Sequence, residues 1–164
     1  MEIQVATTAD IEAITHVEIE SKLQSFPELM EPHDTDFETR AYRWKTYFAK
    51  QSPASAMPQR IILKAIDQDK IIGYLAVHLT SRYDKDAEIQ SFYVLKEYQR
   101  RGIGTALLKE AISWAIDHNA KSLCVGIAPE NPYQQFYLKY GGSFLNPHWI
   151  VWEDISELKV KLYI

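Results

Sequence analysis

Residues 99–105, Gln-Arg-Arg-Gly-Ile-Gly-Thr, combine residue types that can bind an anion. The segment follows the strand-like run 87–94 and begins the long amphipathic run 102–119. At such a junction the first N–H groups of a helix lack partners and carry the positive end of its dipole. Two glycines open the main chain to a ligand and two arginines can add charge-assisted contacts: Gly102, Gly104, Arg100 and Arg101. These residues alone are compatible with a pyrophosphate site or with a helix start that carries solvated charges.

The spacing of the glycines differs from two common phosphate-binding motifs. A P-loop needs Gly-Lys-Ser/Thr after four intervening residues, a pattern that residues 99–105 do not have. The dinucleotide-binding fingerprint needs a third glycine where Leu107 stands. The segment therefore predicts an anion site of another kind.

Length and composition limit the class of protein. The chain has 164 residues, 46% of them hydrophobic, and a formal net charge of −4. We expect one globular domain over residues 1–164. The negative charge argues against a nucleic-acid binder that works by general electrostatics. The sequence has no run of about eighteen apolar residues, so we expect no membrane span, and residues 1–5 do not resemble a signal peptide. A single cysteine excludes an internal disulfide and fits a reducing cytosol, so we expect a cytoplasmic protein without membrane or nucleic-acid partners.

Cysteine and histidine usage predicts no metal centre. Cys124 is the only cysteine and lies in the apolar run 122–127, which is typical of a buried strand. No histidine lies nearby to activate it, so we expect a core residue rather than a nucleophile. The five histidines have no metal-ligand spacing.

The expected elements alternate between strands and helices. Capping boxes at residues 7–10 and 35–38 predict two helices, one to about residue 23 and one to about residue 50. The remaining elements are strands over 3–6, 60–66, 71–79, 88–94 and 121–127, a helix from 102, a short helix N-capped by Asn131-Pro132, and strands over 143–153 and 159–163. This order, β-α-α-β-β-β-α-β-α-β-β, indicates an α+β fold with a mixed, partly antiparallel sheet flanked by helices.

That order, with Gln99, Gly102 and Gly104 opening the central helix, resembles the GNAT superfamily of N-acetyltransferases. The three residues meet its signature, Gln/Arg-x-x-Gly-x-Gly/Ala. A second block is similar to the family's Asn-x-x-Ala-x-x-Phe-Tyr-x-x-x-Gly-Phe and consists of Asn131, Phe136-Tyr137 and Tyr140-Gly141. The resemblance covers nearly the whole chain. It fails at Gln134, where the family often has alanine, and at Gly142, where it has phenylalanine.

The resemblance implies acetyl-coenzyme A as co-substrate and assigns its binding residues. The pyrophosphate is expected on Gln99, Arg100, Arg101, Gly102, Ile103, Gly104 and Thr105. The pantetheine arm is expected along the backbone of Phe92, Tyr93 and Val94, with Asn131 also at the site. In the family the fourth and fifth strands diverge, and the thioester lies in that gap.

Transfer to an amine needs a base for the amine and an acid for the departing thiol. Tyr137 matches the family tyrosine near the sulfur and is the expected acid; core packing is the alternative. Glu88 lies fourteen residues before Gly102, as the basic glutamate of protein-acetylating members does, and is the expected base. Strand alternation would place it on the face of Gln90, Phe92 and Val94. The alternatives are an exposed strand-end charge at Glu88, or Tyr93 or water as base; the N–H of Val94 is the expected oxyanion donor.

The acceptor is predicted only as a small-molecule or peptide amine. Residues 18–38 hold seven acidic side chains, which would favour a cationic acceptor such as a polyamine or a lysine side chain. An ordinary solvated helix face is the preferred explanation of these residues. The aromatic late strands are compatible with a homodimer. A non-catalytic acyl-coenzyme A sensor of the same fold is the alternative function.

Overall fold

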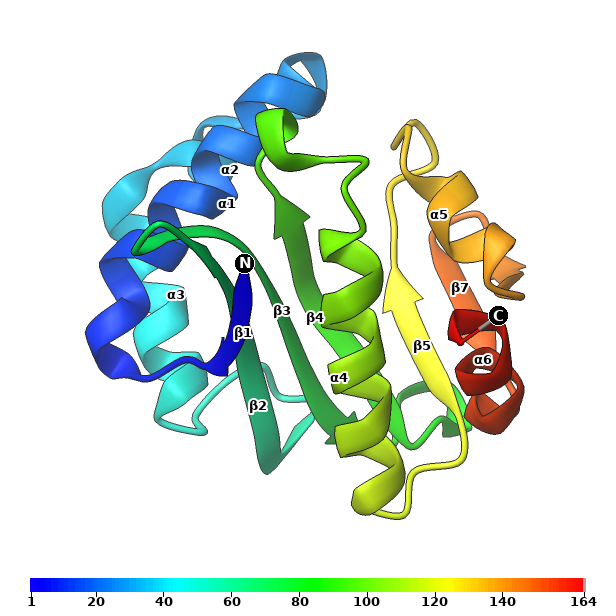
Figure 1. Ribbon diagram of the computed structural model, residues 1–164. Helices are drawn as coiled ribbons and strands as arrows, with labels where there is room; N and C mark the ends of the chain where they lie inside the picture. Colours follow the sequence, from blue (N-terminus) through cyan, green and yellow to red (C-terminus); the bar gives the residue numbers. More distant parts are fainter. Residues whose placement is uncertain (164) are drawn as a thin grey trace.

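The structure, a computed structural model, describes residues 1–163. Figure 1 shows its helices and strands. In chain order they are β1 (Glu2–Val5), α1 (Ile11–Ser25), α2 (Pro32–Thr35), α3 (Phe37–Phe48), β2 (Ala56–Asp67), β3 (Lys70–Thr80), β4 (Ala87–Val94), α4 (Ile103–Asp117), β5 (Leu123–Gly126), α5 (Gln134–Lys139), β6 (Ser143–Asn146), β7 (Trp149–Trp152) and α6 (Ile155–Leu162). None of these helices is long and apolar enough to cross a membrane.

The strands form one sheet in the order β1-β2-β3-β4-β5-β7-β6. All neighbouring strands are antiparallel except β4 and β5, which run parallel. The long connection through α4 makes this parallel pair possible, because parallel neighbours need a crossover. The predicted α+β fold with a mixed, partly antiparallel sheet is confirmed.

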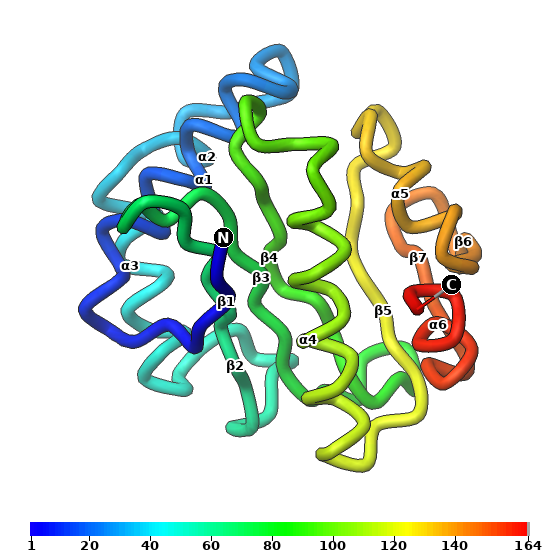
Figure 2. Tube along the Cα trace, in the orientation of Figure 1, coloured from blue at the N-terminus to red at the C-terminus, as the bar shows by residue number. Residues whose placement is uncertain are grey.

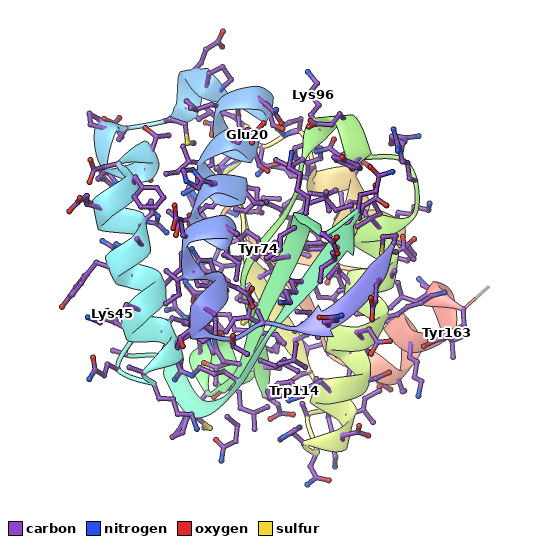
Figure 3. The ribbon with its side chains drawn as sticks, turned by 60° about the vertical axis from the view of Figure 1, so that its left-hand side comes forward. Glu20, Lys45, Tyr74, Lys96, Trp114 and Tyr163 are labelled. Atoms are coloured by element: carbon purple, nitrogen blue, oxygen red, sulfur yellow. The ribbon has the colours of Figure 1, made fainter. Side chains whose placement is uncertain are left out.

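Helices cover both faces of the sheet (Figures 1 and 3). α4 packs on one face with a broad apolar stripe, the buried residues Ile103, Leu107, Leu108, Ala111, Ile112 and Ala115. α1 and α3 pack on the other face, where the Trp44 ring meets the Tyr74 ring edge-on with 5.3 Å between centroids. Tyr74 lies between these helices and the sheet in Figure 3. The sheet is therefore buried between two helical layers.

Local signals at the start of the chain and in the hairpin predicted these elements correctly. Thr7 forms the expected capping box with Asp10. The cap of α3 is Asp36, whose side chain accepts from the N–H of Thr39, one residue later than the predicted start of the box. β2 and β3 form the expected hairpin with Asp67 opposite Lys70.

The C-terminal prediction is wrong, because residues 155–162 form helix α6 and no strand exists over 159–163. Asp154 caps this helix by accepting from the N–H of Ser156. The spacing of its buried residues is helical: Ile155, Leu158 and Leu162. The predicted strand over 143–153 is instead the hairpin of β6 and β7. The sheet keeps seven strands, and its last element packs as a helix near α4.

Cys124 is fully buried in β5, which confirms it as a core residue. Burial raises the pKa of its thiol to about 12. Such a thiol is not ionised near neutral pH and is a poor nucleophile.

Candidate active site

A β-bulge in β4 determines which side chains reach each face of the sheet. Val77 of β3 pairs with Ile89, but Ala76 pairs with Ser91, so one extra residue, Gln90, lies between them. The predicted alternation is therefore wrong. Glu88 shares its face with Ser91 and Tyr93, because their partners on β3 are His78, Ala76 and Tyr74.

Beyond the bulge, β4 loses its neighbour on one side. β5 pairs with β4 only at residues 87, 88 and 89. Figure 2 shows the chain of β5 and the loop that follows it running apart from the end of β4. The divergence that the resemblance implied is present, and it leaves one edge of β4 open from Gln90 to Val94.

The open edge presents free backbone groups of Val94. The N–H of Leu95 donates to the carbonyl of Ile72 at 2.9 Å. Gly73 and Val94 are thus a non-hydrogen-bonded pair of the ladder, and the N–H and C=O of Val94 point away from β3. Gln99 Nε2 donates to the Val94 carbonyl at 2.9 Å, so the N–H of Val94 is the group that remains for a ligand.

A cavity of about 910 Å³ lies along this edge. One wall comes from α1 and α3, and the opposite wall comes from the start of α4 and the segment around α5. The expected cofactor-binding residues in its lining are Phe92, Tyr93, Val94, Gln99, Arg100, Gly102, Gly104, Thr105 and Asn131. The cavity thus joins the two helical layers of the fold through the gap between β4 and β5.

The start of α4 has the geometry expected of an anion site. Gly102 is its N-cap at φ +82°, a conformation that favours glycine, and no side chain caps the helix. Ala106 makes the first bond to Gly102, an N–H to carbonyl contact of 3.0 Å. The preceding N–H groups of the first turn have no partner in the helix.

Two of the predicted residues in this segment direct their side chains elsewhere. The Arg101 guanidinium lies over the Tyr98 ring, 5.3 Å from its centroid. Ile103 packs in the core and is 5% exposed. Their backbone N–H groups are what they offer to a ligand.

Tyr133, which the sequence analysis did not select, connects three parts of the cavity rim. Its hydroxyl donates to Gln99 Oε1 at 3.1 Å and lies 2.8 Å from Ser25 Oγ of α1. Its N–H donates to Asn131 Oδ1 at 2.7 Å. Asn131 therefore forms a turn, and α5 begins at Gln134 rather than at Pro132, which corrects the predicted N-cap.

The two departures from the family signature have structural reasons. Gln134 donates to the carbonyl of Ala128 at 3.1 Å, so its amide bonds the preceding loop. A Cβ at Gly142 would lie 2.6 Å from Ile150 Cγ2 and 2.9 Å from the Trp152 ring. The Trp152 ring, which faces Gly142, also packs against Tyr137, with 5.9 Å between their ring centroids.

Tyr137 lines the cavity and is itself buried. Its ring packs edge-on against Phe92 and Phe136. Burial raises the pKa of its hydroxyl well above the ordinary tyrosine value, so the hydroxyl stays protonated. Within residues 1–163 this hydroxyl makes no hydrogen bond. The side chain therefore packs in the core and also presents a free donor to the cavity.

Glu88 is buried at 5% exposure, which excludes the exposed strand-end alternative. Its Oε1 lies 3.1 Å from Arg82 Nε and 3.5 Å from His78 Nε2. His78 Nδ1 lies 2.9 Å from the hydroxyl of Tyr47, and Tyr47 lines the cavity. Glu88 thus lies one residue behind the lining. The Glu88–His78–Tyr47 chain reaches the cavity through one hydrogen bond, between His78 and Tyr47, and one charge contact, between Glu88 and His78, which is not a hydrogen bond.

The lining favours the solvated-face explanation of the acidic residues over an acidic rim. Of the seven carboxylates in residues 18–38, Glu18 alone belongs to the described lining. Asp34 accepts from the N–H of Glu31, Asp36 caps α3, and Glu20 accepts from Gln24. These carboxylates stabilise helix ends or lie at the surface, as the solvated-face alternative proposed.

No group of three or more His, Cys, Asp or Glu side chains in the described part of the chain could hold a metal ion.

The sheet with its diverging β4–β5 pair, and the glycine-rich start of α4 beside it, define a GNAT-type acetyltransferase fold. The chain belongs to the Acetyltransferase (GNAT) family, whose model matches residues 16–142.

Comparisons with individual proteins agree with this family. YuaI of Bacillus subtilis, named an uncharacterized N-acetyltransferase, is 32% identical over 89 residues, 47% of this chain and 51% of YuaI. The chain spans about half the length of the curated relatives it matches. The paiA N-acetyltransferase of Thermoplasma acidophilum, solved with coenzyme A, has a TM-score of 0.70 at 18% identity over 92% of this chain and 98% of its own. A GNAT acetyltransferase of Brucella melitensis, solved with acetyl-CoA, has a TM-score of 0.64 at 17% identity over 92% and 86%. These two structures share the fold.

Proposed function

We propose that this protein is an acetyl-coenzyme A-dependent N-acetyltransferase that moves an acetyl group to a primary amine. One observation carries the proposal: the cavity extends from the first turn of α4, past the open edge of β4, to the wall of α1 and α3. Two substrates could therefore meet at Val94 from opposite faces of the sheet. Family membership supports the donor, as do the coenzyme A and acetyl-CoA complexes of the two structural neighbours.

The donor fits the residues of the α4 wall. The N–H groups from Arg101 to Thr105 would bind the pyrophosphate, and Arg100 would add a charge-assisted contact. The arm of the donor contains amides that can pair with the free edge of β4 at Phe92–Val94, as an added strand does. With this pairing the thioester would lie beside the N–H of Val94, which would donate to the oxyanion.

Tyr137 is the proposed acid. The reaction forms a C–N bond and breaks the C–S bond, so the sulfur departs as a thiolate. The Tyr137 hydroxyl, kept protonated by burial, would donate a hydrogen bond to this sulfur. The pKa of Tyr137 lies above that of a thiol, near 8.5. The hydroxyl would therefore stabilise the departing thiolate by a hydrogen bond before any full proton transfer.

Glu88 would support the base from a distance. The nitrogen that attacks must lose a proton, which we propose passes to the Tyr47 oxygen while the Tyr47 proton passes to His78 Nδ1. His78 would then be an imidazolium between Tyr47 and the Glu88 carboxylate. Glu18, the carboxylate in the lining, is already bonded by Lys22, Arg40 and Trp44, and is not available for this role.

The test is release of free thiol from acetyl-coenzyme A in the presence of a panel of primary amines, with residues 1–164 as a single catalytic domain. Amine-dependent thiol release is the expected result. Donor binding without turnover on any amine would instead support the acyl-coenzyme A sensor. Failure to bind the donor would refute both functions.

A further inference from the structure

The charged residues in the cavity lining are mostly positive. The described lining contains five cations and one carboxylate: Lys22, Arg40, Arg43, Arg100, Lys139 and Glu18. Arg100 lies beside the start of α4, where we place the pyrophosphate. Lys22, Arg40 and Arg43 belong to α1 and α3, the wall that faces the proposed acceptor. The acceptor wall therefore carries its own excess of positive charge.

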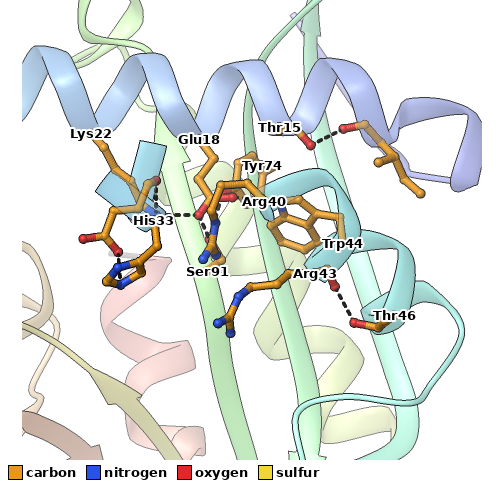
Figure 4. Close-up of polar contacts among 12 residues, drawn as sticks. Thr15, Glu18, Lys22, His33, Arg40, Arg43, Trp44, Thr46, Tyr74 and Ser91 are labelled. Carbon is orange, nitrogen blue, oxygen red and sulfur yellow. Dashed lines mark hydrogen bonds and ion pairs between the residues drawn. The ribbon is translucent and has the colours of Figure 1, made fainter. Parts of the chain in front are cut away.

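Glu18 is neutralised within the protein. Its Oε2 lies 2.7 Å from Lys22 Nζ and 2.9 Å from Arg40 Nη2, and its Oε1 accepts from Trp44 Nε1 at 2.8 Å. Figure 4 shows Glu18 on α1 meeting Arg40 and Trp44 from α3. Two cations on one buried carboxylate leave this cluster with a net positive charge, and a cationic ligand would find no free carboxylate there.

One face of α3 directs polar groups toward the cavity. The residues at spacing i, i+3, i+4 and i+7 all belong to the lining: Arg40, Arg43, Trp44 and Tyr47. Arg43 has no ion pair within residues 1–163, whereas Arg40 is paired with Glu18. Arg40 Nε and the Oγ of Ser21, another lining residue, are buried without a hydrogen-bond partner in the described structure. This wall has more hydrogen-bond donors than acceptors.

We propose that the amine acceptor carries an anionic oxygen group, in the first instance a carboxylate, which the Arg43 guanidinium binds. This inference rests on the proposed acetyl transfer and specifies its acceptor. A planar guanidinium binds a carboxylate through two parallel hydrogen bonds, and the net positive charge of the Lys22–Glu18–Arg40 cluster on the same wall adds attraction. The amine of the same molecule would point along β4 to Val94. A polyamine would instead meet like charge from all three cations.

Pairs of acceptors that differ only in a carboxylate test whether the protein prefers an anionic acceptor. Amino acids and short peptides that carry a primary amine are each assayed beside their carboxyl amides, with putrescine as the cationic reference and O-phosphoethanolamine as a phosphate source. We expect kcat/KM for the acids to exceed that for the amides by about tenfold or more. A preference for O-phosphoethanolamine over every carboxylate would support an anionic acceptor whose charged group is a phosphate instead of a carboxylate. Equal or better turnover of the amides or of putrescine would overturn the inference.

Variants then assign the effect to one side chain. Arg43→Gln should raise KM for a carboxylate acceptor about ten- to a hundredfold and leave KM for acetyl-coenzyme A unchanged. The KM of Arg43→Lys for the same acceptor should lie between those of the unchanged protein and Arg43→Gln, because lysine keeps the charge but loses the two parallel hydrogen bonds. Lys45→Gln, an exposed α3 residue outside the lining, is the control. If Arg43→Gln matches the control, the inference fails.

The inference and the proposed function fail in different ways. Turnover of amides and polyamines with the expected donor would reject the anionic acceptor alone. Donor binding with no turnover of any carboxylate or phosphate amine would also count against it. Loss of donor binding itself would reject the acetyltransferase.

Discussion

The hydroxyl of Tyr47 on α3 lies 2.9 Å from Nδ1 of His78 on β3. His78 is fully buried, and its other nitrogen faces Glu88 at 3.5 Å. In the tautomer with the proton on Nε2, Nδ1 accepts from Tyr47; Nε2 itself, 3.5 Å from Glu88 Oε1, makes no hydrogen bond within the described residues. The pair thus connects the cavity to a buried carboxylate on the next strand.

Tyr47→Phe should lower kcat by about ten- to a hundredfold with KM for both substrates nearly unchanged. The change removes the hydroxyl that connects the cavity to His78 and keeps the ring in the core. Steady-state kinetics measures it, with the exposed Tyr42→Phe on the same helix as control. A kcat equal to that of the control would remove the Glu88–His78–Tyr47 chain from the mechanism.

Tyr137→Phe should lower kcat by roughly ten- to a thousandfold and retain donor affinity. Its hydroxyl makes no hydrogen bond within the described residues, so its removal leaves no protein partner unsatisfied. The measurement is thiol release together with calorimetric binding of coenzyme A. An unchanged rate would leave Tyr137 with a packing role only.

Gly104→Glu should abolish binding of coenzyme A. The substitution adds bulk and a negative charge where we place the pyrophosphate. Gly104→Ala is the matched control, since its Cβ would lie 3.6 Å from the Phe92 ring and 3.7 Å from the Phe136 ring, which is ordinary contact. Binding by the glutamate variant would place the pyrophosphate elsewhere.

Glu18→Gln should destabilise the fold by about 3 kcal/mol, because Lys22 and Arg40 would lose their buried counter-charge. That corresponds to a fall in Tm of roughly 6–12 °C. Thermal unfolding measures it, with Glu20→Gln, an exposed residue of the same helix, as control. Equal Tm values for the two variants would mean that the cluster does not hold α1 against α3.

The thiol of Cys124 should be unreactive toward Ellman's reagent in the folded protein at pH 8 and react fully after unfolding. Burial raises its folded-state pKa to about 12. The linked stability is therefore fully present below about pH 8.5, the unfolded value, and is lost as the pH rises toward 12. Rapid labelling of the native protein would contradict the burial of β5.

The sequence predicted those features that depend on neighbouring residues. The start of α4 follows from two glycines and two arginines within residues 99–105, and the capping box at Thr7 from four consecutive residues. The strand expected over 159–163 is wrong because the apolar positions of so short a segment fit a strand or a helix.

Features that depend on packing between distant segments could not be predicted. The bulge at Gln90 has no signal in its residue type and reverses the expected faces of β4. Glu18 gains its role only when α3 brings Arg40 and Trp44 beside it, more than twenty residues later. The residues Arg40, Arg43, Trp44 and Tyr47 have helical spacing in the sequence. Only the folded structure shows that this helix face lines the cavity.

The cavity has walls from two separate parts of the chain. The α1–α3 wall comes from residues 18–53, and the wall at α4 and α5 from residues 99–140, with β4 between them. Mutation can therefore alter one wall without disturbing the other. In evolutionary terms, a lineage could exchange its acceptor by changing α1 and α3 while inheriting the donor site intact.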